Sequence, residues 1–264
     1  MFESDREPVV IADPEATEVD RAIAEHAICF VSDGCTLQTG IGSIPSVVAG
    51  LLADGPLGDF GIHSEMFTTG LMKLHQAGKV TNRKSVSGST RLDGASVTTF
   101  AAGVPALYEW LDGNNDVRFL PVDVVNSPEI IAANRKMVTI NGAMALDMSG
   151  QVAADALGSR QFSGVGGHED FLAGPGLRAE DRSLLCLPST AVADGISKSR
   201  IVPRFDAGAL ISAPRHQVDV VITEHGVAEL EGRTISERAT ALASISDPQF
   251  RDELMDHALT WPRS

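Results

Sequence analysis

The chain has 264 residues, of which 43% are apolar and 21% charged, so it can bury the core of one large α/β domain or two small ones. Its formal net charge of −14 repels nucleic acid and anionic lipid, which argues against binding to either. The three cysteines have no Cys-x-x-Cys spacing, which argues against a disulfide framework and a metal site. With a charged N-terminus and no apolar run of the ~20 residues that span a bilayer, we expect a cytoplasmic protein.

The first half of the chain alternates helices with strands. Apolar spacing predicts a helix over residues 15–31, with Asp13 and Pro14 suited to its N-cap and first turn. A strand over residues 35–38 precedes a helix over residues 45–52, for which Ser43 is the expected N-cap. A strand over residues 60–64, a helix over residues 66–77 and short strands and turns over residues 81–101 follow.

The second half continues this alternation and predicts the fold class. A helix is expected over residues 103–111, strands over residues 117–120, 137–146, 184–187, 209–212 and 218–223, and closing helices over residues 233–243 and 248–259. Strands separated by helices imply an α/β fold with an open, largely parallel sheet. We expect a single domain over residues 1–264, with residues 1–8 as an extension and ligands at the carboxyl ends of the strands.

Two glycine-rich segments are candidates for anion binding. Gly40-Ile41-Gly42 joins a predicted strand to a helix, where its N–H groups can face a cleft. It resembles a dinucleotide fingerprint, but Pro45 replaces the third glycine, which makes nicotinamide or flavin binding a poor alternative. Gly164-Val165-Gly166-Gly167 allows a similar close approach of the backbone to a ligand. Packing turns and a flexible surface loop remain the alternatives.

Glu65 is the leading candidate for a catalytic side chain. It ends the predicted strand that carries His63 and therefore lies at the same sheet edge as the first glycine loop. The alternative is a carboxylate placed at a helix start, where it interacts with the helix dipole. His63 has no second histidine or cysteine at metal-ligand spacing, so a structural role is favoured for it.

Other polar residues also follow predicted strands or precede helices. Glu224 ends the strand over residues 218–223, with a helix cap as the alternative. Asn126 belongs to the segment Asn126-Ser127-Pro128-Glu129, which by itself is typical of a capping box that opens a helix over residues 129–133. Four basic residues in the third quarter could meet phosphates, although a solvated basic face is the commoner explanation; they are Lys198, Arg200, Arg204 and Arg215.

Taken together, these segments resemble the acetyl-CoA hydrolase/transferase family, which includes 4-hydroxybutyrate, butyrate and succinate:acetate CoA-transferases. The resemblance extends from about residue 9 to residue 254. Its landmarks are Thr39-Gly40-Ile41-Gly42-Ser43-Ile44-Pro45, Gly61-Ile62-His63-Ser64-Glu65-Met66, Val80-Thr81-Asn82, Gly164-Val165-Gly166-Gly167, Pro188-Ser189-Thr190-Ala191 and Ile222-Thr223-Glu224-His225-Gly226.

The resemblance implies a CoA-transferase fold and specific roles for these residues. Glu65 matches the family's nucleophile, which forms a glutamyl-CoA thioester, and Asn126 and Glu224 match its other catalytic residues. The N–H groups of the two glycine loops serve as oxyanion donors, which points to Ile41 and Gly42 in the first and to Gly166 and Gly167 in the second. Coenzyme A then enters as a substrate with a small carboxylic acid, and no tightly bound cofactor is implied.

The resemblance is to the C-terminal catalytic half of the family. The N-terminal half, which supplies part of the substrate pocket, has no counterpart here, so we expect a homo-oligomer or a hetero-oligomer in which another chain supplies that half. Acyl-CoA hydrolysis and a non-catalytic CoA-ester-binding subunit are the alternatives to CoA transfer.

Overall fold

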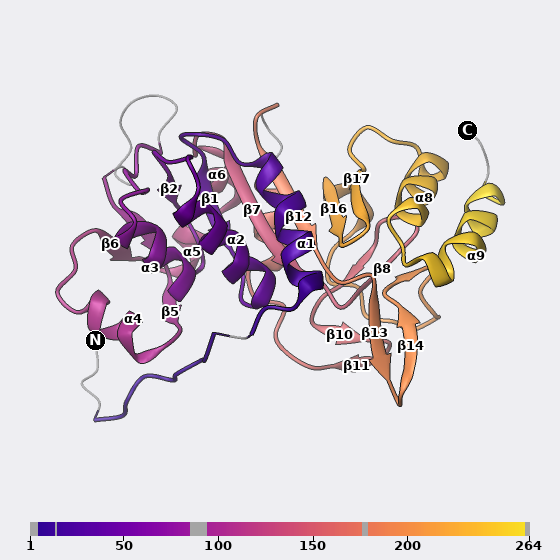
Figure 1. The fold of residues 1–264 in the computed structure, drawn as a ribbon, viewed down its shortest axis with the longest axis horizontal. Coiled ribbons are helices and arrows are strands. Elements are labelled where there is room, and N and C mark those ends of the chain that lie inside the picture. The colour runs from indigo at the N-terminus through magenta and orange to yellow at the C-terminus, as the bar shows by residue number, and fades with distance from the viewer. Residues whose placement is uncertain (1–4, 14, 85–93, 176–178, 262–264) are drawn as a thin grey trace.

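The computed structural model describes residues 5–13, 15–84, 94–175 and 179–261, and a parallel sheet forms its centre (Figure 1). Within these residues the sheet has six strands in the order β17-β16-β12-β7-β1-β2. Their bounds are β1 Thr36–Thr39, β2 Gly61–Ile62, β7 Met137–Gly142, β12 Arg182–Cys186, β16 Val220–Thr223 and β17 Gly226–Glu229. All neighbours are parallel except β16 and β17, which form an antiparallel pair. The predicted open, largely parallel sheet is therefore confirmed.

Helices cover both faces of this sheet because its central strands are apolar on both sides. Leu184 of β12 packs into one core and Leu185 into another, since successive side chains of a strand point to opposite faces. The helices of the first core include α1 Glu18–Ala27, α2 Ser43–Asp54 and α3 Thr69–Gln76. Those of the second are α7 His168–Ala173, α8 Ile235–Ser244 and α9 Pro248–Leu259. In Figure 1 α2, α3 and α4 Pro105–Leu111 lie at the left and β16, β17, α8 and α9 at the right, with α1, β7 and β12 between them.

The first two helices begin at residues other than those predicted. Helix α1 starts at Glu18 because the Thr17 hydroxyl accepts the N–H of Asp20 while the Asp20 carboxylate accepts the N–H of Thr17. Asp13, the predicted N-cap, instead forms a 3.0 Å ion pair with Lys73, and Pro14 lies outside the described residues. Helix α2 includes Ser43 and is preceded by Gly42, whose φ of 131° favours glycine.

The helix predicted over residues 66–77 is wrong in its first turn. Met66–Thr68 forms strand β3, which pairs in parallel with β5 Phe100–Ala102, and helix α3 begins only at Thr69. Phe67 is fully buried in this pairing, and the Thr68 hydroxyl accepts the N–H of Leu71 as the N-cap. The run from residue 66 to 68 therefore keeps Glu65 in a connection between two strands.

Shorter elements complete the described chain. The ribbons are β4 Ser96–Thr98 with β6 Val117–Phe119, β15 Ile201–Val202 with β8 Ala145–Asp147 and β9 Val152–Ala153, β10 Ala156–Leu157 with β11 Arg160–Gln161, and β13 Thr190–Ala193 with β14 Ile196–Ser199. The remaining helices are α4 Pro105–Leu111, α5 Val122–Val125, α6 Pro128–Ala132 and the 3-10 turns Ile28–Phe30 and Arg215–Gln217. Residues 85–93 of the predicted mixed region, and residues 1–4 of the predicted extension, lie outside the described residues.

Two strand predictions need correction. Residues 209–212 form no strand, and only the adjacent Ala213 makes an isolated bridge, to Val152. The single strand predicted over residues 137–146 is two strands, because β7 ends at Gly142 in the central sheet and β8 starts at Ala145 in a different one. No helix in the described ranges is both long and apolar enough to cross a membrane.

Truncation of Leu37 tests the importance of the central core. Leu37 lies on β1 and is fully buried, so Leu37→Ala should lower the free energy of unfolding by about 2–5 kcal/mol through lost burial and a residual cavity. Leu259→Ala is the matched control, because Leu259 is 63% exposed and its truncation should change that free energy by less than about 0.5 kcal/mol. Urea unfolding of both variants measures the difference, and equal losses would contradict the assignment of Leu37 to the core.

Candidate active site

Glu65 lies beyond the carboxyl end of β2, where its backbone is held firmly. Its carbonyl oxygen accepts the N–H of Thr99 at 2.9 Å, the N–H of Phe100 at 3.2 Å and the hydroxyl of Thr98 at 2.9 Å. These three donors fix the peptide from which the side chain projects. The alternative of a carboxylate at a helix start is wrong, because β3 separates Glu65 from α3.

The carboxylate of Glu65 contacts the second glycine loop directly. Its Oε2 accepts the backbone N–H of Gly167 at 2.8 Å, although the two residues are 102 positions apart. A Cβ at Gly167 would lie 2.5 Å from Oε2 of Glu65 and 2.4 Å from Nδ2 of Asn126, so an added methyl group would have to displace these two side-chain ends. Gly166 has a φ of 57°, the left-handed conformation that glycine adopts most easily. The second loop therefore packs its bare backbone against the candidate nucleophile.

The two glycine loops and Glu65 line one cleft of about 480 Å³. Three of the predicted donors, Ile41, Gly166 and Gly167, lie around it together with Glu65. The N–H of Ile41 has no hydrogen-bond partner among the described residues, so this donor is available to a ligand. The structure thus brings both loops and Glu65 to one cleft, and the place of the first loop there agrees with the sheet edge at which the strands before it and before Glu65 end.

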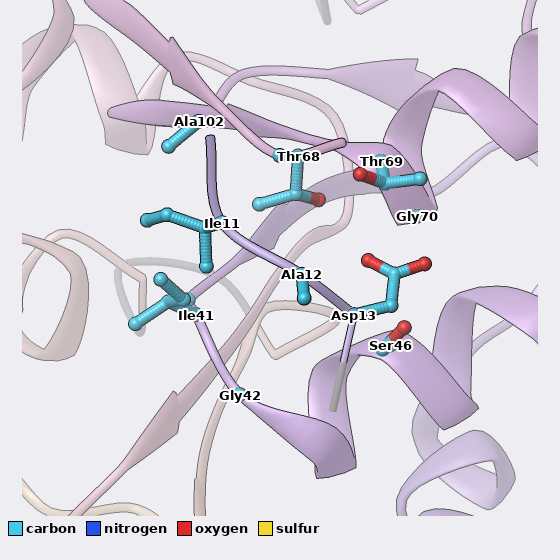
Figure 2. A pocket seen from close by; sticks show the side chains of 12 residues that line it. Ile11, Ala12, Asp13, Ile41, Gly42, Ser46, Thr68, Thr69, Gly70 and Ala102 are labelled. Carbon is cyan, nitrogen blue, oxygen red and sulfur yellow. The ribbon is translucent and has the colours of Figure 1, made fainter. Parts of the chain in front are cut away.

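Gly42 belongs to a second hollow on the other side of Ile41. This pocket has a volume of about 210 Å³, and Gly40 and Ile41 line both it and the cleft. Figure 2 shows the segment Ile11–Asp13 passing across it, between Gly42 and the turn at Thr68–Gly70. An N–H of Ile11 donates to the carbonyl of Gly103 at 2.9 Å and holds the segment there. The first loop therefore separates the Glu65 cleft from a smaller pocket.

Asn126 lies behind Gly167 rather than on the cleft surface. It is 8% exposed, its Nδ2 donates to Oδ2 of Asp170 at 3.2 Å, and its buried Oδ1 has no hydrogen-bond partner among the described residues. Burial raises the pKa of Asp170, and the hydrogen bond from Asn126 opposes that rise. The capping-box interpretation is wrong, because Ser127 makes no side-chain cap to α6 and Asn126 instead ends α5.

His63 connects the strand before Glu65 to the segment before Asn126. Its Nε2 lies 2.7 Å from the carbonyl of Val125, an acceptor, so the proton is on Nε2. Burial lowers the pKa of His63 to about 4, so it is neutral near pH 7. Among the described residues no group of histidine, cysteine and acidic side chains could hold a metal ion. The geometry therefore favours the structural role expected for His63.

Glu224 lies at the same sheet edge but does not line the Glu65 cleft. It follows β16, and its two carboxylate oxygens accept the N–H of Ser189 at 2.9 Å and the Ser189 hydroxyl at 2.6 Å. Its charge also raises the pKa of the half-buried Arg200, against the larger lowering by burial. The helix-cap alternative does not apply, since β17 follows Glu224.

Sequence reasoning missed the polar pair at the base of the cleft. Nε2 of Gln38 donates to Oδ1 of Asn141 at 3.0 Å, and Nδ2 of Asn141 donates to Oε1 of Gln38 at 3.2 Å. Both residues are buried near the carboxyl ends of the central neighbours β1 and β7. The available signal was an amide side chain late in each apolar strand, which is unusual for a buried sheet.

Solved structures with the same fold show to which class of protein this chain is similar. A RipA structure from Yersinia pestis has 36% sequence identity and a TM-score of 0.85, with 95% of this chain and 55% of that chain covered. A 4-hydroxybutyrate CoA-transferase from Porphyromonas gingivalis has 33% identity and a TM-score of 0.78, covering 95% and 57%. The CoA-transferase type of α/β fold is thereby confirmed.

Sequence comparison then identifies the family. The profile of the acetyl-CoA hydrolase/transferase C-terminal domain matches residues 103–258. A 4-hydroxybutyrate coenzyme A transferase from Clostridium kluyveri is 41% identical over 243 residues, which are 92% of this chain and 55% of that relative. The chain belongs to the acetyl-CoA hydrolase/transferase family, and it spans about half the length of the curated relatives it matches.

The buried His63 should make stability depend on pH. Because its folded pKa of about 4 lies below the ordinary 6.5, the unfolded chain binds more protons between these values, and stability falls as the pH drops from 6.5 to 4. His63→Gln retains a donor but does not titrate, so it should flatten this decline by at most about 1.4 kcal/mol per pH unit. Urea unfolding between pH 7 and about pH 4 measures the slope. His257→Gln, at an exposed histidine, is the control, and an unchanged slope in the His63 variant would contradict the assignment.

Proposed function

We propose that this chain carries the catalytic carboxylate of an acyl-CoA:carboxylate CoA-transferase. The observation that supports this proposal is the 2.8 Å hydrogen bond from the N–H of Gly167 to Oε2 of Glu65, in a cleft that the first glycine loop also lines. The acids named for the relatives, such as 4-hydroxybutyrate and butyrate, suggest a short-chain carboxylic acid as acceptor. Coenzyme A and its esters enter as substrates.

The proposed reaction begins with attack by Glu65. A carboxylate oxygen of Glu65 bonds to the thioester carbonyl carbon, the C–S bond breaks, and CoA leaves as the thiolate with the bonding electron pair. The thiolate then attacks the glutamyl carbonyl of the mixed anhydride, which gives a glutamyl-CoA thioester and releases the first acid as its carboxylate. The second carboxylate reverses these steps and leaves as the new CoA ester, so the kinetics are ping-pong.

The two glycine loops would stabilise different oxyanions in this scheme. Gly167 already donates to an oxygen of Glu65, so it is placed to stabilise negative charge when the glutamyl carbonyl is attacked. The N–H of Ile41, which has no partner in the described part of the chain, is the candidate donor to the oxygen of the substrate acyl group, with Gly42 and Gly166 shaping the two loops. Such fixed donors are needed because the net charge of −14 disfavours further negative charge.

Asn126 and Glu224 have less direct places in the proposal. Asn126 packs against the face of Gly167 that a Cβ would occupy, so we assign it to positioning the oxyanion donor. Glu224 would act through its contacts with Ser189 and with the neighbouring charge of Arg200. A second chain in an oligomer would complete the substrate pocket. That chain would correspond to the part of the relatives' length that this chain does not span.

Removal of the nucleophile is the first test. Glu65→Ala should abolish exchange of CoA between an acyl-CoA and a carboxylate, and hydroxylamine trapping of the glutamyl thioester should be lost with it. The assay is run on the chain alone and on the chain mixed with the remaining half of a relative. Exchange that persists in Glu65→Ala would refute the assignment. Thiol release without added carboxylate, dependent on Glu65, would instead indicate hydrolysis.

The second glycine loop allows a matched pair of variants. Gly167→Ala would force a methyl group against Glu65 and Asn126, so kcat should fall about 10²–10³-fold as the donor is displaced. Gly164→Ala is the control, since a Cβ there meets nothing within 4 Å, and it should retain nearly full activity. Steady-state kinetics of both variants, with thermal unfolding to confirm folding, make the comparison. Equal activity in the two variants would show that Gly167 has no part in the site.

A further inference from the structure

A second large concavity lies away from Glu65 and is lined by basic side chains. Its volume is about 680 Å³, and its lining includes Arg204, Arg215, Arg233 and Arg238 together with Thr234 and Trp261. No acidic residue is among the described lining residues. Four of the 21 lysines and arginines of a protein with net charge −14 therefore meet in one cleft, which we call the arginine cleft.

The topology places the arginine cleft at the sheet edge opposite the Glu65 cleft. Arg215 lies in the 3-10 turn that leads into β16, at the amino end of that strand. Arg233 follows β17, and β17 is antiparallel to β16 with Val220 opposite Glu229, so it ends at the same edge. Glu65 and the first glycine loop instead follow the carboxyl ends of β2 and β1. The two clefts share no lining residue among those described.

Arg238 builds the arginine cleft from within. It is only 8% exposed, and its Nη1 donates to the carbonyl of Arg215 at 2.6 Å while its Nε donates to the carbonyl of Arg233 at 3.4 Å. One buried guanidinium thus links the two backbone segments that carry the exposed arginines. Gly150 packs closely here, since a Cβ there would lie 3.0 Å from Nη1 of Arg238. The arrangement is therefore set by the core and not by mobile surface side chains.

The exposed Arg204, Arg215 and Arg233 have guanidinium N–H groups that can donate hydrogen bonds to a ligand. The guanidinium of Arg204 lies 4.6 Å from the ring centre of Trp261, a stacking contact that leaves its in-plane N–H groups available. Within the described part of the chain, the side chains of Arg204, Arg215 and Arg233 form no ion pair and no hydrogen bond. Glu237, on the first turn of α8, is occupied by the N–H and hydroxyl of Thr234.

Like charges this close repel each other unless an anion neutralises them. Burial lowers the pKa of Arg238, and the positive charge of Arg215 adds to that lowering. Guanidinium groups bind phosphate oxygens through pairs of parallel N–H donors, and several of them converging on a concave site suit a ligand with more than one charge.

We propose that the arginine cleft binds a phosphorylated small molecule through a diphosphate or similar polyanionic group. Arg204, Arg215 and Arg233 supply the donors, and Arg238 is a positioning residue. The ligand is distinct from the acyl-CoA that the Glu65 cleft is proposed to bind, because the two clefts lie at opposite edges of the sheet.

Calorimetric titration of the full chain with inorganic pyrophosphate tests this site. Arg215→Gln and Arg233→Gln should each weaken binding about tenfold, since each removes a charged hydrogen-bond donor. Arg21→Gln is the matched control, because Arg21 is an exposed arginine on α1 outside the cleft, and it should leave the affinity unchanged. Thermal unfolding of each variant confirms that it folds.

Glu65→Ala separates this proposal from the proposed function. That variant removes the CoA-transfer chemistry but should bind pyrophosphate as the wild-type chain does. The proposal is overturned if wild-type protein does not bind pyrophosphate, or if Arg21→Gln weakens binding as much as the cleft variants do. Displacement of pyrophosphate by coenzyme A in Glu65→Ala would also overturn it, because the arginine cleft would then be part of the acyl-CoA site.

Discussion

The hydrogen bond between the N–H of Gly167 and the carboxylate of Glu65 is the contact on which the site depends. It joins residues 102 positions apart, and it forms only where the backbone of one segment can approach a side chain of another without a Cβ between them. The sheet provides that approach, because Glu65 follows the carboxyl end of β2 and the second glycine loop leads directly into α7, which packs beside β7. The side chain of Asn126 also packs against Gly167, in the space that a Cβ would fill. The absence of a side chain at this position therefore lets Glu65, Asn126 and the second glycine loop meet.

Glu65 is supported on its other sides by contacts that leave its carboxylate free to react. Three donors from residues 98–100 hold its carbonyl, and the neutral His63 ties the preceding strand to Val125. The buried pair of Gln38 and Asn141 supports the base of the cleft with mutually satisfied amides. Such groups place uncharged donors around an acid in a strongly acidic protein, where a general positive field is absent.

The two edges of the sheet carry different electrostatic environments. The Glu65 cleft is lined by the two glycine loops and by the amides of Gln38 and Asn141, whereas four arginines line the arginine cleft. In a parallel sheet the amino ends of the strands lie at one edge and the carboxyl ends at the other. The antiparallel β17 returns the chain to the amino edge, where α8 begins shortly after Arg233. A single antiparallel strand at the end of the sheet is thus what brings Arg233 and Arg238 to the segment that carries Arg215.

The sequence by itself determined the fold class, because strand-like runs such as residues 184–187 and residues 218–223 recur along the chain with helices between them, an alternation typical of a largely parallel sheet. It also placed Glu65 and the first glycine loop at one edge, since each follows a predicted strand, whereas the position of the second loop came from the tertiary structure. Helix α9 matched its predicted range because Asp247 and Pro248 provide a local start signal. Local signals failed where pairing partners decide the structure: residues 66–68 became a strand through residues 100–102, and residues 209–212 found no partner. Only the tertiary structure decided which glycine touches Glu65, that Asn126 lies behind it and that Glu224 does not line its cleft, because those contacts depend on the order of strands in the sheet and not on distance along the chain.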